Sequence, residues 1–401
     1  MKRSGSSDSE FPARVGPVSY LGLALLSQTG MSFVQQGLIV LGAVFLKVYN
    51  LNLTQLGLVT TALASGVMVS MVFVGGFVDR RGPRTILFWG TVLMTGLSLL
   101  LLLTRSFAYL LVVLVFLGMA LATAPAAGTK AVFTAFHNRS RGLVMGIRQT
   151  GVPLGATLAA WLLPALALHF GLHTIYEVFS IELLVTGWVF CAAMYAWPTA
   201  PRRAGGWLPI ERSEIHYLTR PALTAFVMSA GQYILLTYSI TALEHHHIGI
   251  EVAGIILAAS QISGGVARIL LGQLSDRVRH RSKVIAGVAV SGATIALIVG
   301  LLPTNASVWI VAVIWVIFGF SAVGWNALVL TWAGESVSSS NSGAAMSLTA
   351  SFVFFGAAIF PPLFGAVVDL THHYVFGWLM LMVVLLFGAW VAFGAESSVR
   401  G

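Results

Sequence analysis

The chain has 401 residues, of which 57% are hydrophobic and only 9% are charged. Folding hides at most about 75% of the surface of a chain this long, so a soluble protein could not bury so much apolar surface. The composition excludes a water-soluble enzyme, a disordered chain and a nucleic-acid-binding protein. We interpret the formal charge of +9 first as a sign of how the chain is oriented in a membrane, because basic residues concentrate on the cytoplasmic side. The single cysteine, Cys191, excludes an intrachain disulfide framework.

Segments long and apolar enough to cross a bilayer recur twelve times along the chain, because a membrane helix needs about 20 mostly apolar residues. The sequence therefore predicts an all-α membrane protein with twelve transmembrane helices. The predicted spans are 17–46, 53–78, 84–104, 107–135, 141–167, 174–197, 221–244, 250–275, 283–303, 306–334, 342–368 and 374–395.

The lysines and arginines predict the orientation of these spans. With the N-terminus inside, 17 of the 22 basic residues fall on inner segments and only Lys47 and Arg105 on outer loops. The other three, Lys130, Arg148 and Arg268, lie at membrane depth. Because positive charge concentrates on the cytoplasmic side, both termini are predicted to be cytoplasmic. We expect a multi-pass protein of the bacterial plasma (inner) membrane.

The sequence also contains an internal repeat. A shift of 197 residues places Met31 on Met228 and Asp79 on Asp276, and a shift of 201 aligns 142–156 with the eleventh span. Parallel repeats of this kind are typical of transporters whose substrate site lies between the halves. The predicted order is a cytoplasmic tail, a six-helix bundle, a cytoplasmic linker, a second six-helix bundle and a cytoplasmic tail, at 1–16, 17–197, 198–220, 221–395 and 396–401.

A charged motif follows the second and the eighth predicted spans. A glycine four residues before an aspartate lets a neighbouring helix approach closely, and the aspartate and the arginines can pair with another helix end. One copy alone could be a charged turn at the membrane edge, but two copies at one offset argue against chance. The motif residues are Gly75, Asp79, Arg80, Gly82 and Arg84 in the first copy, and Gly272, Asp276, Arg277 and Arg281 in the second.

Residues 75–84 match in full the signature G-x-x-x-D-R-x-G-x-R of the major facilitator superfamily (MFS), which the chain resembles over essentially its whole length. The second copy departs from the signature at Arg279, where a glycine would stand, and residues 141–155 resemble the fifth span of many bacterial members. The resemblance implies two six-helix bundles that rock around a central cavity, with both motifs as a conformational latch. It does not imply a particular substrate.

Two arginines lie at similar predicted depths. Arg148 is about 10 Å past Arg141, and Arg268 is about 12 Å before Asp276, at 1.5 Å per residue. The resemblance makes their spans neighbours across the halves, and the guanidinium fork suits planar oxyanions. Residues 266–269 also resemble the carboxylate-binding arginine segment of oxalate/formate exchangers and monocarboxylate transporters. The alternatives are snorkelling to the interface or, for Arg148, an ion pair with Asp79.

Uncharged polar side chains recur at helical spacing on the first and seventh spans, where Gln35 and Gln232 are repeat mates. The alternative is hydrogen bonding between helices that stabilises packing. The predicted substrate-binding set is Arg268, Arg148, Gln35, Gln232, Tyr233, Gln149, Gln261, Trp325 and Asn326.

Acidic residues are scarce in the predicted lining, which is therefore positive and favours anions over cationic drugs. Glu182 and Glu335 are the nearest candidates for proton coupling. We expect no metal, because adjacent helical residues in His245-His246-His247 point about 100° apart. The chain has no Walker loop and no hydrolase motif, so we expect no cofactor and no enzymatic activity.

The leading functional prediction is a secondary active transporter of a small anion, such as a monocarboxylate or an inorganic oxyanion. We expect it to work by alternating access as a monomer in the lipid bilayer, with the proton as candidate coupling ion. One alternative is a proton antiporter that exports drugs or metabolites. Another is a non-transporting receptor with the same fold, which would be expected to carry a signalling domain or a long tail.

Overall fold

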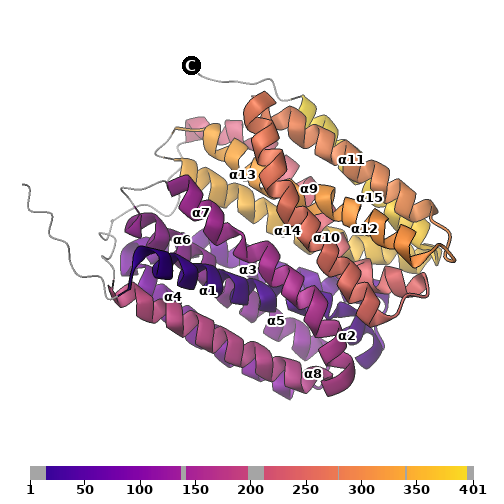
Figure 1. Ribbon diagram of the computed structural model, residues 1–401, viewed down its shortest axis with the longest axis horizontal. Coiled ribbons are helices and arrows are strands. Elements are labelled where there is room, and N and C mark those ends of the chain that lie inside the picture. The colour runs from indigo at the N-terminus through magenta and orange to yellow at the C-terminus, as the bar shows by residue number, and fades with distance from the viewer. Residues whose placement is uncertain (1–14, 137–140, 197–211, 279, 339–340, 395–401) are drawn as a thin grey trace, which may run out of the picture.

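The computed structural model describes residues 15–136, 141–196, 212–278, 280–338 and 341–394. These residues are helical apart from short turns and connections. The predicted tails and the first part of the predicted linker lie outside the described residues, apart from residues 15–16. The two sets of helices, α1–α8 and α9–α15, lie side by side (Figure 1).

The first half contains eight helices, several of which are pieces of one predicted span. A short 3-10 segment, Leu101–Leu103, extends α4, and another, Met194–Ala196, extends α8. The helices are α1 Pro17–Val40, α2 Gly42–Val48, α3 Leu53–Arg81, α4 Pro83–Leu100, α5 Phe107–Leu121, α6 Thr123–Ala135, α7 Arg141–Gln149 and α8 Gly151–Ala193.

The second half follows the same order. Its first helix is described from Arg212, within the predicted linker, and the Glu214 carboxylate accepts hydrogen bonds from Ser338 and Asn341 that hold the first described turn of α9 in place. The helices are α9 Arg212–His245, α10 Ile250–Val278, α11 Arg281–Leu301, α12 Val308–Gly324, α13 Asn326–Glu335, α14 Ser342–Thr371 and α15 Tyr374–Phe393.

Ten helices within the described residues are long and apolar enough to cross a membrane, or eleven if α1 and α2, bent by 43°, count as one span. The predicted fifth span covers α7 and the first part of α8, and the predicted sixth falls in the second part of α8, after Gly171, which has a φ of 76° and a ψ of 173°. That backbone conformation is open to glycine and interrupts the helix. Twelve spans and cytoplasmic termini stay predictions.

Local sequence signals account for several helix ends. Asn52 and Gln55 form a reciprocal capping box at the start of α3, which satisfies two backbone N–H groups there. Gly82, with a φ of 87°, ends α3, and Pro83 begins α4. The charged motif therefore turns the chain sharply at a position that requires glycine.

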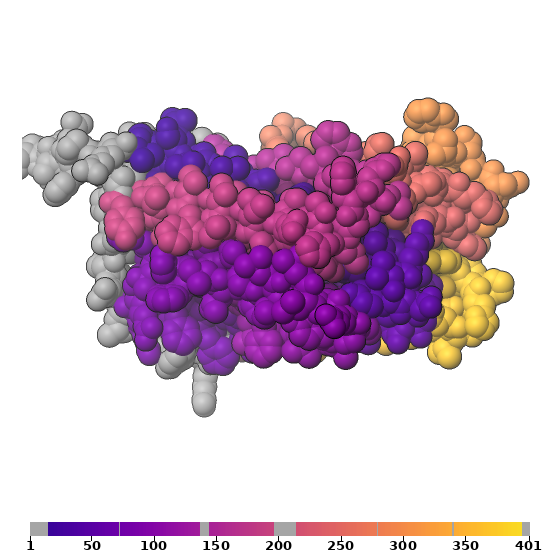
Figure 2. Space-filling model, turned by 90° about the horizontal axis from the view of Figure 1, so that it is seen from below, coloured from indigo at the N-terminus to yellow at the C-terminus, as the bar shows by residue number. Residues whose placement is uncertain are grey.

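Large apolar side chains cover the outside of the molecule. Phe116, Ile181 and Trp309 are each more than half exposed, which would be unfavourable in water and is expected where helices face lipid tails. Figure 2 shows one side, where first-half helices in indigo to magenta form most of the surface and the last helix, in yellow, lies at one end.

The two halves meet along a seam, formed mainly by α3 against α14 and α8 against α10. We call the ends of the molecule the Asp79 end and the Asp369 end; the first is predicted to be cytoplasmic and the second outer. The side-chain hydrogen bonds that join one half to the other within the described ranges lie toward the Asp369 end. The protein is therefore closed at the Asp369 end in this structure.

Candidate functional site

Arg268 lies on a face of α10 that borders the seam. Gly265 on the same helix contacts Pro153 of α8 in the other half. The Nε of Arg268 donates a hydrogen bond of 3.3 Å to the Val323 carbonyl, in the last turn of α12. No described residue accepts a hydrogen bond from its two terminal nitrogens, and neither nitrogen is enclosed. The guanidinium is thus anchored on one edge and available on the other.

Arg148 takes up a different environment, inside the first half. Its side chain is 2% exposed. One terminal nitrogen donates to the Thr129 hydroxyl at 3.1 Å, the other to the Ala124 carbonyl at 3.4 Å, and its buried Nε has no partner. A Cβ at Gly128 would collide with the guanidinium, so this glycine makes room for it. Arg148 is committed to α6 rather than to a shared site with Arg268.

The two arginines nevertheless occupy related places in the repeat. The fourth span of the first half breaks between α5 and α6, and the corresponding span of the second half breaks between α12 and α13. Arg148 donates to a carbonyl next to the first break, and Arg268 to one next to the second. The last four carbonyls of a helix lack intrahelical partners, so the Val323 carbonyl, in the last turn of α12, is available to Arg268, whereas the Ala124 carbonyl lies in the first turn of α6.

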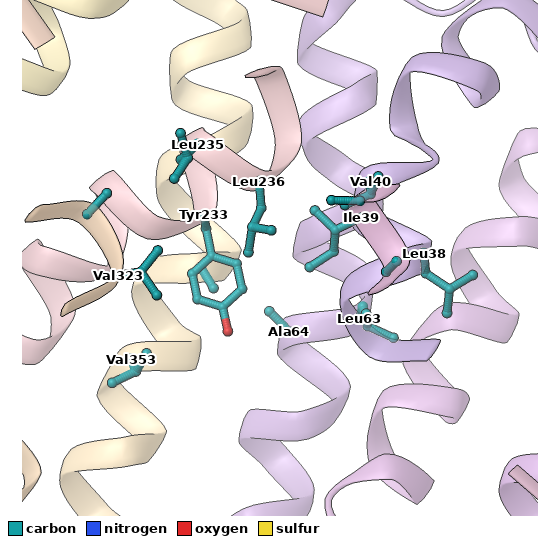
Figure 3. Packing of buried hydrophobic residues seen from close by; sticks show 14 of the residues in the cluster. Leu38, Ile39, Val40, Leu63, Ala64, Tyr233, Leu235, Leu236, Val323 and Val353 are labelled. Carbon is teal, nitrogen blue, oxygen red and sulfur yellow. The ribbon is translucent and has the colours of Figure 1, made fainter. Parts of the chain in front are cut away.

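Tyr233 is the aromatic neighbour of Arg268. It is buried on α9 and lies close enough to Arg268 to interact with it electrostatically. Figure 3 shows its ring in the seam region, with the hydroxyl pointing away from Leu235 and Leu236 and with Ala64 of α3 beside it in this view. The structure therefore brings two members of the predicted set, Arg268 and Tyr233, together beside the first half.

Three predicted glutamines, Gln35, Gln232 and Gln261, are buried. Gln232 has an unpartnered Oε1 and Gln261 an unpartnered Nε2. Gln261 lies seven residues before Arg268, about 10 Å away on the same face of α10. Buried amide atoms without partners are costly, and a polar ligand or water at the seam would satisfy them.

The other predicted members lie elsewhere. Trp325 is fully buried, and its indole N–H donates to the Ala322 carbonyl at 2.8 Å. Its side chain therefore packs at the α12–α13 break and does not line an open cavity. Gln149 is exposed at the end of α7, and Asn326 is half-buried at the start of α13. Nothing in the structure joins these two residues to Arg268.

The first latch motif forms an ion pair that sequence analysis did not predict. Asp79 pairs with Lys130 at 2.9 Å, which links the end of α3 to α6 within the first half. Lys130, predicted at membrane depth, is therefore paired with an acidic side chain, and Arg148 does not pair with Asp79. The predicted close helix approach is not seen here, because a Cβ at Gly75 or Gly272 would meet nothing within 4 Å.

The second motif forms a larger charged cluster. Arg281 donates to both Glu335 oxygens, at 2.6 and 2.8 Å, and lies 3.0 Å from Asp276. A further bond of 2.8 Å reaches the Ser275 hydroxyl. Glu335, a predicted candidate for proton coupling, therefore joins α13 to the second motif. Its bidentate pair with Arg281 consists of charge-assisted hydrogen bonds, which are stronger than neutral ones.

Asp79→Asn is expected to slow transport a few-fold and to leave anion affinity within about threefold, because both partners are partly exposed and such a pair contributes about 0–1 kcal/mol. Lys130→Gln should have the same effect, since it removes the same ion pair. Transport rates and equilibrium binding of purified protein check this. Loss of binding with a normal transport rate would contradict a latch role.

Sequence analysis missed the residues that close the Asp369 end. The Asp369 carboxylate accepts hydrogen bonds from the backbone N–H groups of Leu53 and Thr54 and from the Thr54 hydroxyl, at 3.1, 2.7 and 2.6 Å. A carboxylate at the C-terminal end of its own helix is unfavourable, whereas it is favourable at the N-terminal end of α3. An acidic residue in the last turn of its own helix was therefore the sequence signal that could have pointed to this contact.

Further contacts hold the same end closed. The Tyr238 hydroxyl donates to the Leu53 carbonyl, and Thr60 and Thr237 share a hydrogen bond of 2.8 Å. Lys47 pairs with Glu244, and His169 lies 3.2 Å from Glu251. A cleft of about 370 Å³ remains above this closure, lined from both halves by Leu46, Leu51, Asn52, Leu53, Thr241, Glu244, His245, Asp369 and Tyr374.

The histidine run lies beside this closure. His245 stacks near Tyr374, with ring centroids 5.1 Å apart, and His246 lies 6.2 Å from the Trp315 ring. Burial lowers the pKa of His246, with a smaller contribution from His245. Within the described ranges no group of three or more His, Cys, Asp or Glu side chains could hold a metal ion.

Comparison with known proteins agrees with this architecture. The sequence profile of the Major Facilitator Superfamily matches residues 23–361 and 221–399. The chain belongs to the Major Facilitator Superfamily. It is a membrane transporter and not an enzyme, as its relatives indicate.

Two relatives and one solved structure illustrate the similarity. The chain is 27% identical to the uncharacterized MFS-type transporter Rv2994 of Mycobacterium tuberculosis over 378 residues, covering 92% of this chain and 83% of that protein. It is 27% identical over 348 residues to the probable nitrate/nitrite transporter NarK2 of the same organism, covering 82% and 84%. A bacterial homologue of the human lysosomal transporter Spinster, in an inward-facing and unoccupied conformation, shares the fold with a TM-score of 0.77 at 17% identity over 97% of both chains.

Proposed function

We propose that this MFS transporter moves a small anion, a monocarboxylate or an inorganic oxyanion, across the bacterial inner membrane by alternating access. Arg268 binds the anion at the seam between two six-helix halves, with the Tyr233 hydroxyl beside it. We place both termini on the cytoplasmic side and count α8 as two of twelve spans. The observation that carries the proposal is the free edge of the Arg268 guanidinium.

The geometry of that guanidinium supports an oxyanion ligand. With Nε bonded to Val323, the two terminal nitrogens present parallel N–H donors, the arrangement that binds a carboxylate or nitrate bidentately. An unpaired charge at membrane depth costs at least about 2.5–3.5 kcal/mol. A bound anion offsets this cost, and no described acidic side chain forms an ion pair with Arg268.

Surrounding groups and one relative support the same class of substrate. The unpartnered Nε2 of Gln261 is a further donor on the face of α10 that carries Arg268. NarK2 is named a probable nitrate/nitrite transporter, and both ions are planar oxyanions. Arg148 has both terminal nitrogens committed to α6, so we assign it a role in holding the first half together.

A thermal-shift screen of the purified protein tests the proposal. Carboxylates, nitrate and cyanate should raise the melting temperature of the wild type, because a ligand that binds only the folded state stabilises it by mass action. The same anions should leave Arg268→Gln unchanged. Stabilisation by cationic drugs with no response to any anion would favour the drug-exporter alternative and overturn the anion assignment.

A further inference from the structure

We propose that Glu182 is the binding site for a proton that is transported together with the anion. This inference rests on the proposed function for the co-transported anion, whereas the protonation state of Glu182 can be tested without it. The site lies within the first half between α1 and α8, away from Arg268 and from both latch motifs.

The position of Glu182 makes a charged carboxylate costly. The second part of α8 runs from the break at Gly171 to Ala193, so Glu182 lies at its centre, about 16 Å from either end. This depth corresponds to the middle of a bilayer core about 30 Å thick. Its neighbours on the outer surface of α8, Ile181 and Val185, are exposed apolar side chains of the kind that face lipid.

The surroundings of the carboxyl offer no counter-ion among the described residues. Both oxygens are buried, and neither has a hydrogen-bond partner among the described residues. The Thr186 hydroxyl lies beside the carboxyl and is a neutral donor within its reach, but it donates to the backbone carbonyl of Glu182 at 3.0 Å. A buried carboxylate with no bonded donor and no counter-ion binds a proton, because the neutral acid avoids most of the desolvation penalty.

The ionisable groups on the helices packed around Glu182 do not change this conclusion. These groups are Tyr20 on α1, Arg84 on α4, and His169, His173, Tyr176, Glu177 and Cys191 on α8. None of them forms an ion pair with Glu182 among the described side chains. The other predicted candidate, Glu335, is already paired with Arg281.

Gly30 on α1 leaves room for the Glu182 carboxyl to pack against the helix backbone. A Cβ at Gly30 would overlap the Glu182 Oε1, so the acid rests directly on the backbone of α1. The neutral acid allows this dry contact, whereas the carboxylate requires water and therefore requires α1 to move off α8. In the step itself, a carboxylate oxygen takes a proton from water on one side of the membrane and returns it to water on the other, and no other bond changes.

Helix α1 links the Glu182 carboxyl to the seam between the halves. The helix that carries Gly30 also carries Gln35 and contacts α9, the helix of Tyr233. A movement of α1 that exposes Glu182 therefore also alters the first-half side of the anion site. This shared helix is the physical link between proton release and rearrangement of the anion site.

Infrared difference spectroscopy of the detergent-purified full chain tests the protonation state directly. The carbonyl stretch of a protonated carboxylic acid should be present in the wild type at neutral pH and absent in Glu182→Gln. Glu177→Gln, a matched change at an exposed glutamate on the same helix, should keep it. Gly30→Ala should shift the band, because the added methyl group displaces the carboxyl. A band unchanged in Glu182→Gln would overturn the proposal.

Transport in proteoliposomes tests the coupling, with radiolabelled lactate, nitrate and nitrite as probes. An imposed proton gradient should drive accumulation in the wild type and in Glu177→Gln but not in Glu182→Gln, while Glu182→Gln keeps anion counterflow. Gradient-driven accumulation by Glu182→Gln at the wild-type level would overturn the coupling. If the infrared band behaves as expected but the wild type carries no anion, the proposed function fails and the protonated Glu182 stands as a site without anion coupling.

Discussion

Arg268→Gln is expected to raise the dissociation constant for the transported anion at least about 100-fold, because it removes two charge-assisted hydrogen bonds of about 1.5–3 kcal/mol each. Arg268→Lys keeps the charge but loses the fork, so a smaller increase of about tenfold is expected. Equilibrium binding of a labelled anion to purified protein measures both effects.

The control for this experiment is Arg105→Gln, the same chemical change at an exposed arginine between α4 and α5. It should bind the anion as the wild type does. Both Arg268 variants should remain folded, since among the described residues they lose a single hydrogen bond, the one to the Val323 carbonyl. If Arg268→Gln binds the anion with wild-type affinity, the arginine is structural and the assignment fails.

The second large effect is expected at the Asp369 end. A Cβ at Gly57 would collide with the backbone of Pro361 and Pro362 on α14, and backbone cannot move aside as the end of a flexible side chain can. Overpacking of this kind costs about 1–3 kcal/mol, which corresponds to a shift of about 5- to 150-fold in a two-state equilibrium. Gly57→Val should therefore hold the halves apart at this end and abolish transport cycles.

Maleimide labelling of Thr60→Cys in a Cys191→Ser background reports this opening. Thr60 is fully buried in the closed seam, so labelling should be slow without the Gly57 change and much faster with it. Gly96→Val, at an exposed position where an added Cβ meets nothing within 4 Å, serves as the matched control. Unchanged labelling in Gly57→Val would show that this contact does not hold the end closed.

The sequence predicted the parts of the fold that local patterns determine. Hydropathy located the apolar helices, of which ten or eleven in the described part of the chain are long enough to cross a membrane, and the charged motif located the turn at Gly82, because both depend on residues close together in the chain. Breaks inside spans were not predicted, although Pro125 marks the one within 107–135: it has no N–H to donate to the Leu121 carbonyl, and α5 ends at Leu121 while α6 begins at Thr123.

Pairings between distant residues could not be predicted from one sequence. Arg148 and Arg268 have similar depth and the same chemistry, yet one is committed to α6 and the other has a free edge at the seam. Their difference depends on which helix each side chain faces after packing. The cap that Asp369 places on α3 joins residues more than 300 positions apart, and only the folded structure brings them together.

Anion counterflow in proteoliposomes tests the central claim most directly. Vesicles loaded with unlabelled anion should take up labelled anion transiently above equilibrium when they contain the wild-type transporter, and should not when they contain Arg268→Gln. Counterflow of an organic cation or a neutral solute but of no anion, or equal anion counterflow by wild type and Arg268→Gln, would contradict the claim that Arg268 binds a transported anion.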